Sequence, residues 1–375
     1  MMRNPLQELV DQGQSVWLDY LSRDLIRSGQ LEEMIATDGL RGITSNPTIF
    51  HGAISGSDTY DDEIASLFAG GQDAEETFET LAIADIRAAC DILLRVYEST
   101  QGRDGFVSLE VSPHLARDTD GTVAAARRLA DRVDYRNLMI KVPATREGLP
   151  AIETLLGEGI NVNITLIFAQ EVYRAVAESY LNALDARAAR GESLDAVASV
   201  ASTFVSRIDT AVDDQLEALA ASRPDAATEA RDLLGQAAIA NSKACYRIFE
   251  EVFGGERFQR LAARGARRQR PLWASTSTKN PAYPTTRYVD ELIGPDTVNT
   301  MPENTMTAFR DTGEVQETVR ADMDFWDEVL ERLQRLGIDL DAVMDQLEDE
   351  GVQKFVDSYD ELLADLDAKA AALRA

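Results

Sequence analysis

Short apolar runs alternate with longer amphipathic stretches along most of the chain. The apolar runs have the length and the β-branched residues typical of strands, whereas the stretches between them repeat apolar residues at helical spacing. In residues 121–134, for example, Val123, Leu129 and Val133 fall on or near one face. The pattern predicts eight strand segments, each followed by helix, at residues 15–19, 41–50, 105–113, 137–145, 160–168, 196–204, 270–277 and 296–302.

This alternation favours an α/β fold with a parallel sheet, because helices between parallel strands cover the sheet from outside. Eight such units fit a closed (β/α)8 TIM barrel. An open doubly wound sheet is the second possibility, although no glycine-rich turn follows the first strand. We predict a single domain over residues 1–375, with a leading helix at about 4–13 and the barrel over about 15–310. A helical extension is predicted over about 315–375, with everything after Glu314 in helix.

The charge of the chain limits its partners. The 375 residues include 65 acidic and 37 basic side chains, which gives a net charge of −28. Such a surface repels nucleic acid and anionic membranes, so we expect neither as a partner. An anionic substrate would need cations placed locally against this field. The sequence is compatible with a homo-oligomer and does not decide the point.

Cysteine and histidine content bears on the compartment and on metals. Cys90 and Cys245 both fall in helical stretches, which predicts a reducing compartment and no disulfide framework. The chain shows no signal sequence and no apolar run long enough to span a bilayer, so we predict a cytoplasmic protein. The two histidines, His51 and His114, cannot by themselves form a metal cluster.

Polar residues close nearly every predicted strand. In a (β/α)8 barrel the active site lies at the carboxyl ends of the strands, where side chains from different strands converge. The polar residues at or near these ends are Asp19, Thr44, Asn46, Glu110, Lys141, Asn163, Thr165, Ser202 and Ser275. They are the candidates for an active site.

Lys141 is the least ordinary of them, because it interrupts the apolar segment NLMIKVPAT in a chain with five lysines. Side chains alternate along a strand, so Lys141 shares a face with Met139, while Ile140 and Val142 point the other way. If the latter pack on the outer helices, the amino group points into the barrel. Burial there favours a neutral amine, which forms a Schiff base with a carbonyl compound. A lysine that snorkels, or that pairs with an acid at a strand end, is the alternative.

Two carboxylates favour the Schiff-base interpretation. That chemistry moves protons to and from carbinolamine and hydroxyl oxygens, and carboxylates near the nitrogen can supply them. Glu110 lies in the apolar segment VSLEVS, where burial would raise its pKa and let it alternate between acid and base. For Asp19 two interpretations are equal: the same role, or the N-cap of the helix that follows.

Other charged segments are predicted to be ordinary surface groups. Lys243, Lys354 and Lys369 lie in helical stretches with surface patterns. The basic run RGARRQR at 264–270 is predicted to be a solvated helix end, with a second phosphate site as the minor alternative. The acidic C-terminal helices are predicted to pack as an amphipathic layer, with a lid or an oligomer contact as the minor alternative.

Four segments resemble motifs of the transaldolase family, in order and spacing: GITSNPTIF, NLMIKVPAT, INVNITLIF and STFVSRID. The resemblance covers about 15–310. It implies a (β/α)8 barrel that transfers a dihydroxyacetone unit from sedoheptulose 7-phosphate to glyceraldehyde 3-phosphate. The products would be erythrose 4-phosphate and fructose 6-phosphate. No metal or organic cofactor is expected, because the lysine imine is itself the electron sink.

The resemblance also implies catalytic roles. Lys141 would be the nucleophile that forms the Schiff base. Glu110 would act through a water held by Thr165 to help form and hydrolyse the imine. Asp19 would take and return the proton of the hydroxyl at the cleaved C–C bond.

Substrate-binding residues follow from the same resemblance. Asn46 and Asn163 would hydrogen-bond the hydroxyls of the dihydroxyacetone unit, with Ser202 beside them. Phe204 would form a wall of the pocket, and Arg207 would bind the phosphate.

The seventh strand departs from better-known members of the family. Those carry Ser-x-Arg after this strand, whereas ASTSTKN offers Ser277 and Lys279. Lysine can replace arginine on a phosphate as a point charge, without the bidentate geometry. Whether Ser275 or Ser277 takes the serine role is open. The long segment 208–263 and the extension after 314 resemble the longer, acidic bacterial branch.

Two other functions are considered as alternatives to the transferase. A lysine-dependent aldolase on the same site would split fructose 6-phosphate and release free dihydroxyacetone. Phe204 favours transfer, because it has no hydroxyl to order an extra water. A barrel that has lost activity and serves as a binding scaffold is less favoured, because all the expected polar positions are filled.

Overall fold

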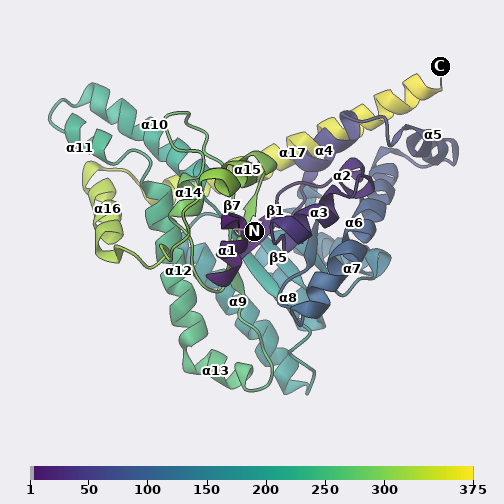
Figure 1. The fold of residues 1–375 in the computed structure, drawn as a ribbon, viewed down its shortest axis with the longest axis horizontal. Helices are drawn as coiled ribbons and strands as arrows, with labels where there is room; N and C mark the ends of the chain where they lie inside the picture. Colours follow the sequence, from purple (N-terminus) through teal and green to yellow (C-terminus); the bar gives the residue numbers. More distant parts are fainter. Residues whose placement is uncertain (1–3, 375) are drawn as a thin grey trace.

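The computed structural model describes residues 4–374, and a closed barrel of eight parallel strands forms its centre (Figure 1). The strands pair in chain order, and the eighth closes the barrel against the first. They are β1 (Gln14–Leu18), β2 (Gly42–Ile43), β3 (Phe106–Glu110), β4 (Leu138–Pro143), β5 (Val162–Ile167), β6 (Ser199–Phe204), β7 (Arg270–Ala274) and β8 (Thr297–Met301). The predicted (β/α)8 barrel is confirmed.

Helices connect the strands and cover the barrel from outside (Figure 1). The first half of the chain contributes α1 (Pro5–Asp11), α2 (Arg23–Arg27), α3 (Gln30–Thr37), α4 (Pro47–Ser55), α5 (Asp61–Ala69), α6 (Ala74–Ser99), the 3-10 turn η1 (Pro113–Leu115), α7 (Thr119–Val133), α8 (Gly148–Glu158) and α9 (Gln170–Ala189). The second half contributes α10 (Ser206–Ser222), α11 (Ala227–Asp232), α12 (Ala237–Gly254), α13 (Glu256–Ala262), α14 (Arg287–Asp290), α15 (Glu303–Thr312), α16 (Met323–Leu336) and α17 (Leu340–Leu373).

The strands are apolar along most of their length because both faces are covered. β1 and β4 through β8 are buried at every position. Their inward side chains fill the barrel, which is a packed core and not a channel. Side chains from the carboxyl ends line a cavity instead, and the candidate site lies there.

The second strand is shorter than predicted. β2 has two residues, and the remainder of the segment 41–50 enters helix α4 at Pro47. Asn46 caps this helix and Pro47 occupies its first turn, two features that start a helix. Gly42 permits close pairing with β1, since a Cβ atom there would lie 2.5 Å from the Trp17 ring.

The chain after the barrel is not helical throughout, so the prediction of helix everywhere after Glu314 is wrong. Residues 313–322 form an irregular connection between α15 and α16. The amides of Thr318 and Val319 donate to the Ile293 carbonyl at 2.9 and 3.0 Å, and Val319 is fully buried. Because these amides are bound to the barrel, they cannot join a helix ladder.

The last helix, α17, has 34 residues and crosses the carboxyl end of the barrel (Figure 1, yellow). The Thr48 hydroxyl of α4 donates to Ser358 at 2.9 Å, and Lys369 pairs with Asp61 of α5 at 2.6 Å. These contacts fix α17 over the mouth of the barrel. No helix within residues 4–374 is both long and apolar enough to cross a membrane.

Candidate active site

Lys141 lies near the end of β4 with its side chain inside the barrel. The residue is 4% exposed, and its Nζ donates to Glu110 Oε2 and to the Ser45 carbonyl, each at 3.1 Å. The amino group therefore does not reach solvent as a snorkelling lysine does. Its partner is a carboxylate that is buried beside it.

Glu110 ends β3 in direct register with Lys141 on β4. Parallel pairing places the two side chains next to each other at the same level of the barrel. Burial raises the pKa of Glu110, and the positive charge of Lys141 opposes part of this rise. A carboxyl group with a raised pKa exchanges its proton closer to neutral pH, as a general acid and base requires.

Asp19 follows β1 and accepts a hydrogen bond from a threonine hydroxyl at the end of the neighbouring strand, which a second threonine hydroxyl supports. The Thr44 hydroxyl donates to Asp19 Oδ1 at 2.6 Å and lies 2.7 Å from the Thr300 hydroxyl. Burial raises the pKa of Asp19, against the opposing charge of Lys141. The N-cap alternative for Asp19 is wrong, because Ser22 caps α2.

A cavity of about 260 Å³, the catalytic cavity, brings most of the predicted residues together. The predicted residues that line it are Asp19, Asn46, Lys141, Thr165, Ser202, Phe204, Arg207, Ser277 and Lys279. Glu110 reaches the cavity only through its contact with Lys141, and Asn163 lies beneath its surface.

Asn163 is fully buried and holds Ser202 in place. Its Oδ1 accepts from the Ser202 hydroxyl at 2.6 Å, and its Nδ2 donates to Ser108 Oγ at 3.0 Å. Asn46 does line the cavity, although its Oδ1 also accepts from the Ile49 amide at 2.9 Å to cap α4. Of the two predicted asparagines, Asn46 is the one placed for direct contact with a ligand.

Thr165 offers the cavity a free hydroxyl. Its Oγ1 is buried and has no hydrogen-bond partner in the part of the chain that the structure describes. The next residue, Leu166, has φ of +58°, and the pairing of β5 with β6 shifts register here. Such irregularities re-aim side chains at functional sites.

Two of the predicted residues that line the catalytic cavity are cations, Arg207 and Lys279. The Arg207 guanidinium lies 5.2 Å from the Phe204 ring centroid and makes no ion pair or hydrogen bond within residues 4–374. Lys279 Nζ donates to Ser277 Oγ at 2.8 Å, whereas the Ser275 hydroxyl lies 2.9 Å from that of Ser206. Ser277 is therefore the serine that pairs with Lys279.

Comparison with known proteins agrees with this arrangement. The family model of Transaldolase/Fructose-6-phosphate aldolase matches residues 16–366. The chain belongs to the transaldolase/fructose-6-phosphate aldolase family. A transaldolase of Thermobifida fusca is 50% identical over 363 residues, which cover 96% of this chain and 97% of that protein. Transaldolases of Mycolicibacterium paratuberculosis (49% over 364 residues, 96% of both chains) and Trichodesmium erythraeum (45% over 373 residues, 98% of both chains) are also similar.

The sequence pattern did not reveal the cavity contact of one lysine or the burial of another. Lys354 of α17, predicted as an ordinary surface residue, is exposed but also lines the catalytic cavity. The ring centroid of Phe355 beside it lies 5.6 Å from Lys141 Nζ. Lys243 is 1% exposed and donates to the Thr318 carbonyl at 2.8 Å. Positions 351, 354, 355 and 358 share a helical face, a signal that could have revealed Lys354.

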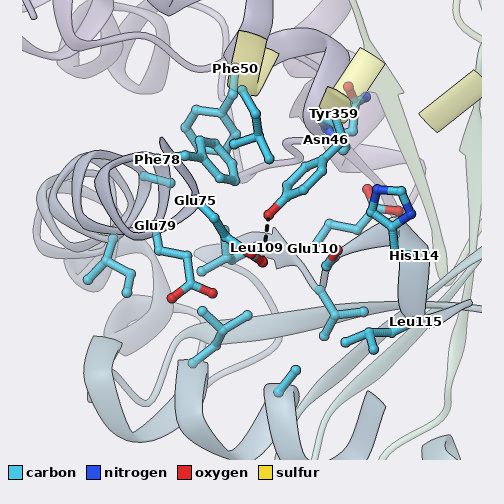
Figure 2. Close-up of a pocket in the computed structure, with 18 of the residues that line it drawn as sticks. Asn46, Phe50, Glu75, Phe78, Glu79, Leu109, Glu110, His114, Leu115 and Tyr359 are labelled. Carbon is cyan, nitrogen blue, oxygen red and sulfur yellow. Dashed lines mark hydrogen bonds between the residues drawn. The ribbon is translucent and has the colours of Figure 1, made fainter. Parts of the chain in front are cut away.

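A second cavity, the side cavity, lies behind Glu110 and has a volume of about 340 Å³ (Figure 2). Figure 2 shows Phe50 and Phe78 on one side of it and Glu110 and His114 on the other, with the Tyr359 hydroxyl directed at Glu75. That hydroxyl donates to Glu75 at 3.2 Å. Glu110 thus separates an apolar chamber from the amine of Lys141.

Proposed function

We propose that this chain is a transaldolase that moves a dihydroxyacetone unit from sedoheptulose 7-phosphate to glyceraldehyde 3-phosphate, which gives erythrose 4-phosphate and fructose 6-phosphate. One observation carries the proposal: the amine of Lys141, which lines the cavity together with Asp19, hydrogen-bonds the carboxyl group of Glu110 in the wall behind it. An amine, two proton carriers and cations for the phosphate are the groups that a Schiff-base reaction on a phosphorylated ketose needs.

The first half of the cycle forms the imine. Lys141 Nζ attacks the ketone carbon of the donor to give a carbinolamine, and loss of water leaves an iminium ion. Glu110 donates and accepts the protons of this step through a water that Thr165 holds. The buried hydroxyl of Thr165, with no other partner within residues 4–374, supports this role.

The second half breaks and makes a C–C bond. Asp19 removes the proton from the hydroxyl on the carbon that becomes the aldehyde, and the electron pair of the broken bond passes to the iminium to give an enamine. After erythrose 4-phosphate leaves, the enamine attacks the aldehyde carbon of the acceptor, and Asp19 returns the proton. Hydrolysis of the new imine then releases fructose 6-phosphate and frees Lys141.

Substrate contacts divide between the two ends of the cavity. Asn46 and Ser202 bind hydroxyls of the three-carbon unit, and Asn163 positions Ser202. Phe204 forms an apolar wall. At the far end Arg207 binds the phosphate.

Lys279 binds the phosphate together with Arg207, and Ser277 holds the lysine in position. No cofactor or metal takes part in this scheme, since the imine accepts the electron pair. Sugar phosphates are then the partners, without nucleic acid. The free, buried thiols of Cys90 and Cys245 support a reducing cytoplasmic location.

Transfer is favoured over simple aldol cleavage. The matching family contains both activities, but the relatives at 45–50% identity carry the name transaldolase. Phe204 supports the same choice, because a phenyl ring cannot orient a water toward the enamine.

Trapping and turnover test the proposal together. Borohydride added with fructose 6-phosphate should leave a reduced dihydroxyacetone adduct on Lys141, detected by peptide mass spectrometry. Fructose 6-phosphate alone should turn over slowly, and erythrose 4-phosphate should accelerate its consumption strongly. Rapid release of dihydroxyacetone without an acceptor would instead identify an aldolase, and absence of any adduct would identify a scaffold.

A further inference from the structure

The packed face of α17 changes its chemistry where the helix crosses the barrel mouth. Elsewhere this face consists of apolar residues such as Leu347, Leu362 and Leu366. At the mouth its buried residues are Gly351, Phe355 and Ser358, and the exposed Lys354 lies at the edge of this face, at the i, i+3, i+4, i+7 spacing of a single helical face. Polar and small residues on a packed face are unusual unless they serve a contact beneath them.

Gly351 brings the helix backbone close to the cationic end of the catalytic cavity. A Cβ atom at this position would lie 3.0 Å from Leu166 Cδ2 and 3.4 Å from a guanidinium nitrogen of Arg207. Even a methyl group here would require the Leu166 or Arg207 side chain to shift, so glycine allows the closest approach of α17 to Arg207. One turn further along, the exposed Lys354 also lines the catalytic cavity.

Lys354 is free of acidic partners although α17 is rich in them. Glu350 precedes it by four residues, the arrangement in which a Glu–Lys pair stabilises a helix. Yet Glu350 accepts from Gln346 at 2.6 Å, and Asp357 on the other side accepts from Gln353 at 2.7 Å. Within residues 4–374 Lys354 makes no ion pair or hydrogen bond. Its ammonium group is left available to a ligand.

Three unpaired or weakly paired cations therefore meet in one cavity of a strongly acidic protein: Arg207, Lys279 and Lys354. Burial lowers the pKa of Lys279, the positive charges of Lys354 and Arg207 lower it further, and the charge of Asp19 opposes them. Like charges in one cavity repel each other. Such an arrangement is stabilised when an anion joins the cations.

We infer that Lys354 is a third cation of the phosphate subsite, and that α17 is thereby part of substrate recognition. The inference rests on the proposed function, which supplies substrates with a terminal phosphate. A phosphate monoester carries a charge of about −1.5 to −2 and three acceptor oxygens. The guanidinium of Arg207 and the ammonium groups of Lys279 and Lys354 provide donors from three side chains.

The position of Phe355 gives this contact a consequence for the chemistry. Phe355 is buried over Lys141, and it follows Lys354 directly on the helix. A phosphate bound by Lys354 therefore holds α17 down at the point where Phe355 excludes water from the imine. A phosphorylated substrate would therefore stabilise the position of α17 over its own reaction site.

Phosphate binding tests the inference without any need for turnover. Isothermal titration of inorganic phosphate into the full chain should give a Kd about tenfold higher for Lys354→Ala than for wild type, the loss of one charge-assisted contact. Lys354→Arg should restore most of the affinity. Gln353→Ala, the matched control on the same turn, should leave the Kd unchanged. An unchanged Kd in Lys354→Ala would overturn the inference.

Kinetics separates phosphate recognition from helix packing. At saturating fructose 6-phosphate, Lys354→Ala should raise KM for erythrose 4-phosphate about tenfold, keep kcat within about twofold, and leave KM for unphosphorylated erythrose unchanged. Equal weakening of both acceptors would show a packing role and overturn the inference. A wild-type chain that binds phosphate through Lys354 but transfers no carbon unit would refute the proposed function alone.

Discussion

Two cavities lie next to each other at the carboxyl end of the barrel, and α17 contributes to both. The catalytic cavity, about 260 Å³, has cations on its wall that make no ion pair or hydrogen bond within residues 4–374, such as Arg207 and Lys354. The side cavity, about 340 Å³, is mainly apolar, and Glu79 on its wall pairs with Arg128. The difference distinguishes a chamber prepared for an anion from one whose charges are already satisfied.

Glu110 and α17 link these two regions. Glu110 lies in the wall between them, and Asn46 lines both. Successive turns of α17 contribute Phe355 to the catalytic cavity and Tyr359 to the side cavity. Because only the catalytic cavity is expected to bind substrate, substitutions that line the two cavities should differ sharply in their effect on catalysis.

The largest effect is expected from Lys141→Ala. Without the amine no imine can form, so kcat should fall by on the order of 10⁵-fold or more. Borohydride trapping with fructose 6-phosphate should give no adduct, while the circular dichroism spectrum stays that of the wild type. Arg335→Ala, which removes an exposed cation of α16 that pairs with Glu328, should keep both activity and adduct. Residual turnover above about 1% in Lys141→Ala would mean that another group is the nucleophile.

Glu110→Gln should reduce kcat by roughly 10²–10³-fold, because it removes a general acid and base but keeps the shape of the side chain. Burial raises the pKa of Glu110, so the wild-type rate should fall, as the pH drops, at a pH above that of an ordinary glutamate. Below this pKa the carboxyl group is protonated and cannot act as a base. The pH profile of kcat in Glu110→Gln should lose this acid limb. An unchanged limb would assign it to Asp19, whose pKa is also raised.

The site residues on the strands could be predicted from the sequence, because the carboxyl ends of all strands in a closed parallel barrel lie at the same face. Alternation along β4 gave the inward direction of Lys141, and register then placed Glu110 beside it. The contribution of α17 could not be predicted in the same way. A helix that follows the last strand can pack on any side of the barrel, and only tertiary contacts such as Thr48 with Ser358 fix its position.

Local hydrogen bonds decided the start of α2 and the conformation of residues 313–322, which the sequence pattern alone did not determine. Asp19 could cap a helix by sequence, but Ser22 stands closer to the first turn of α2 and does so. Residues 313–322 had no helix-breaking pattern strong enough to outweigh the acidic, helix-like sequence around them. Two amides of this segment, those of Thr318 and Val319, donate instead to the Ile293 carbonyl in the connection before β8.

Phe355→Ala should have a moderate and specific effect. Removal of the ring opens a path for water to the imine, so release of dihydroxyacetone from fructose 6-phosphate without acceptor should rise several-fold. Transfer to erythrose 4-phosphate should fall by a similar factor. The measurement is the ratio of free dihydroxyacetone to transferred product. A constant ratio would mean that Phe355 does not keep water from the imine.

Tyr359→Phe should have the smallest effect, because it changes the side cavity alone. The substitution removes the hydrogen bond from Tyr359 to Glu75 but keeps the edge-on ring contact with Phe78 (centroids 5.6 Å apart). Glu75 is exposed, so the loss in the free energy of unfolding should be at most about 1 kcal/mol, measured by urea denaturation. Both kcat and the transfer ratio should stay within about twofold of wild type. A fall in kcat as large as that of Phe355→Ala would show instead that the side cavity acts on Glu110, and that the two chambers work as one.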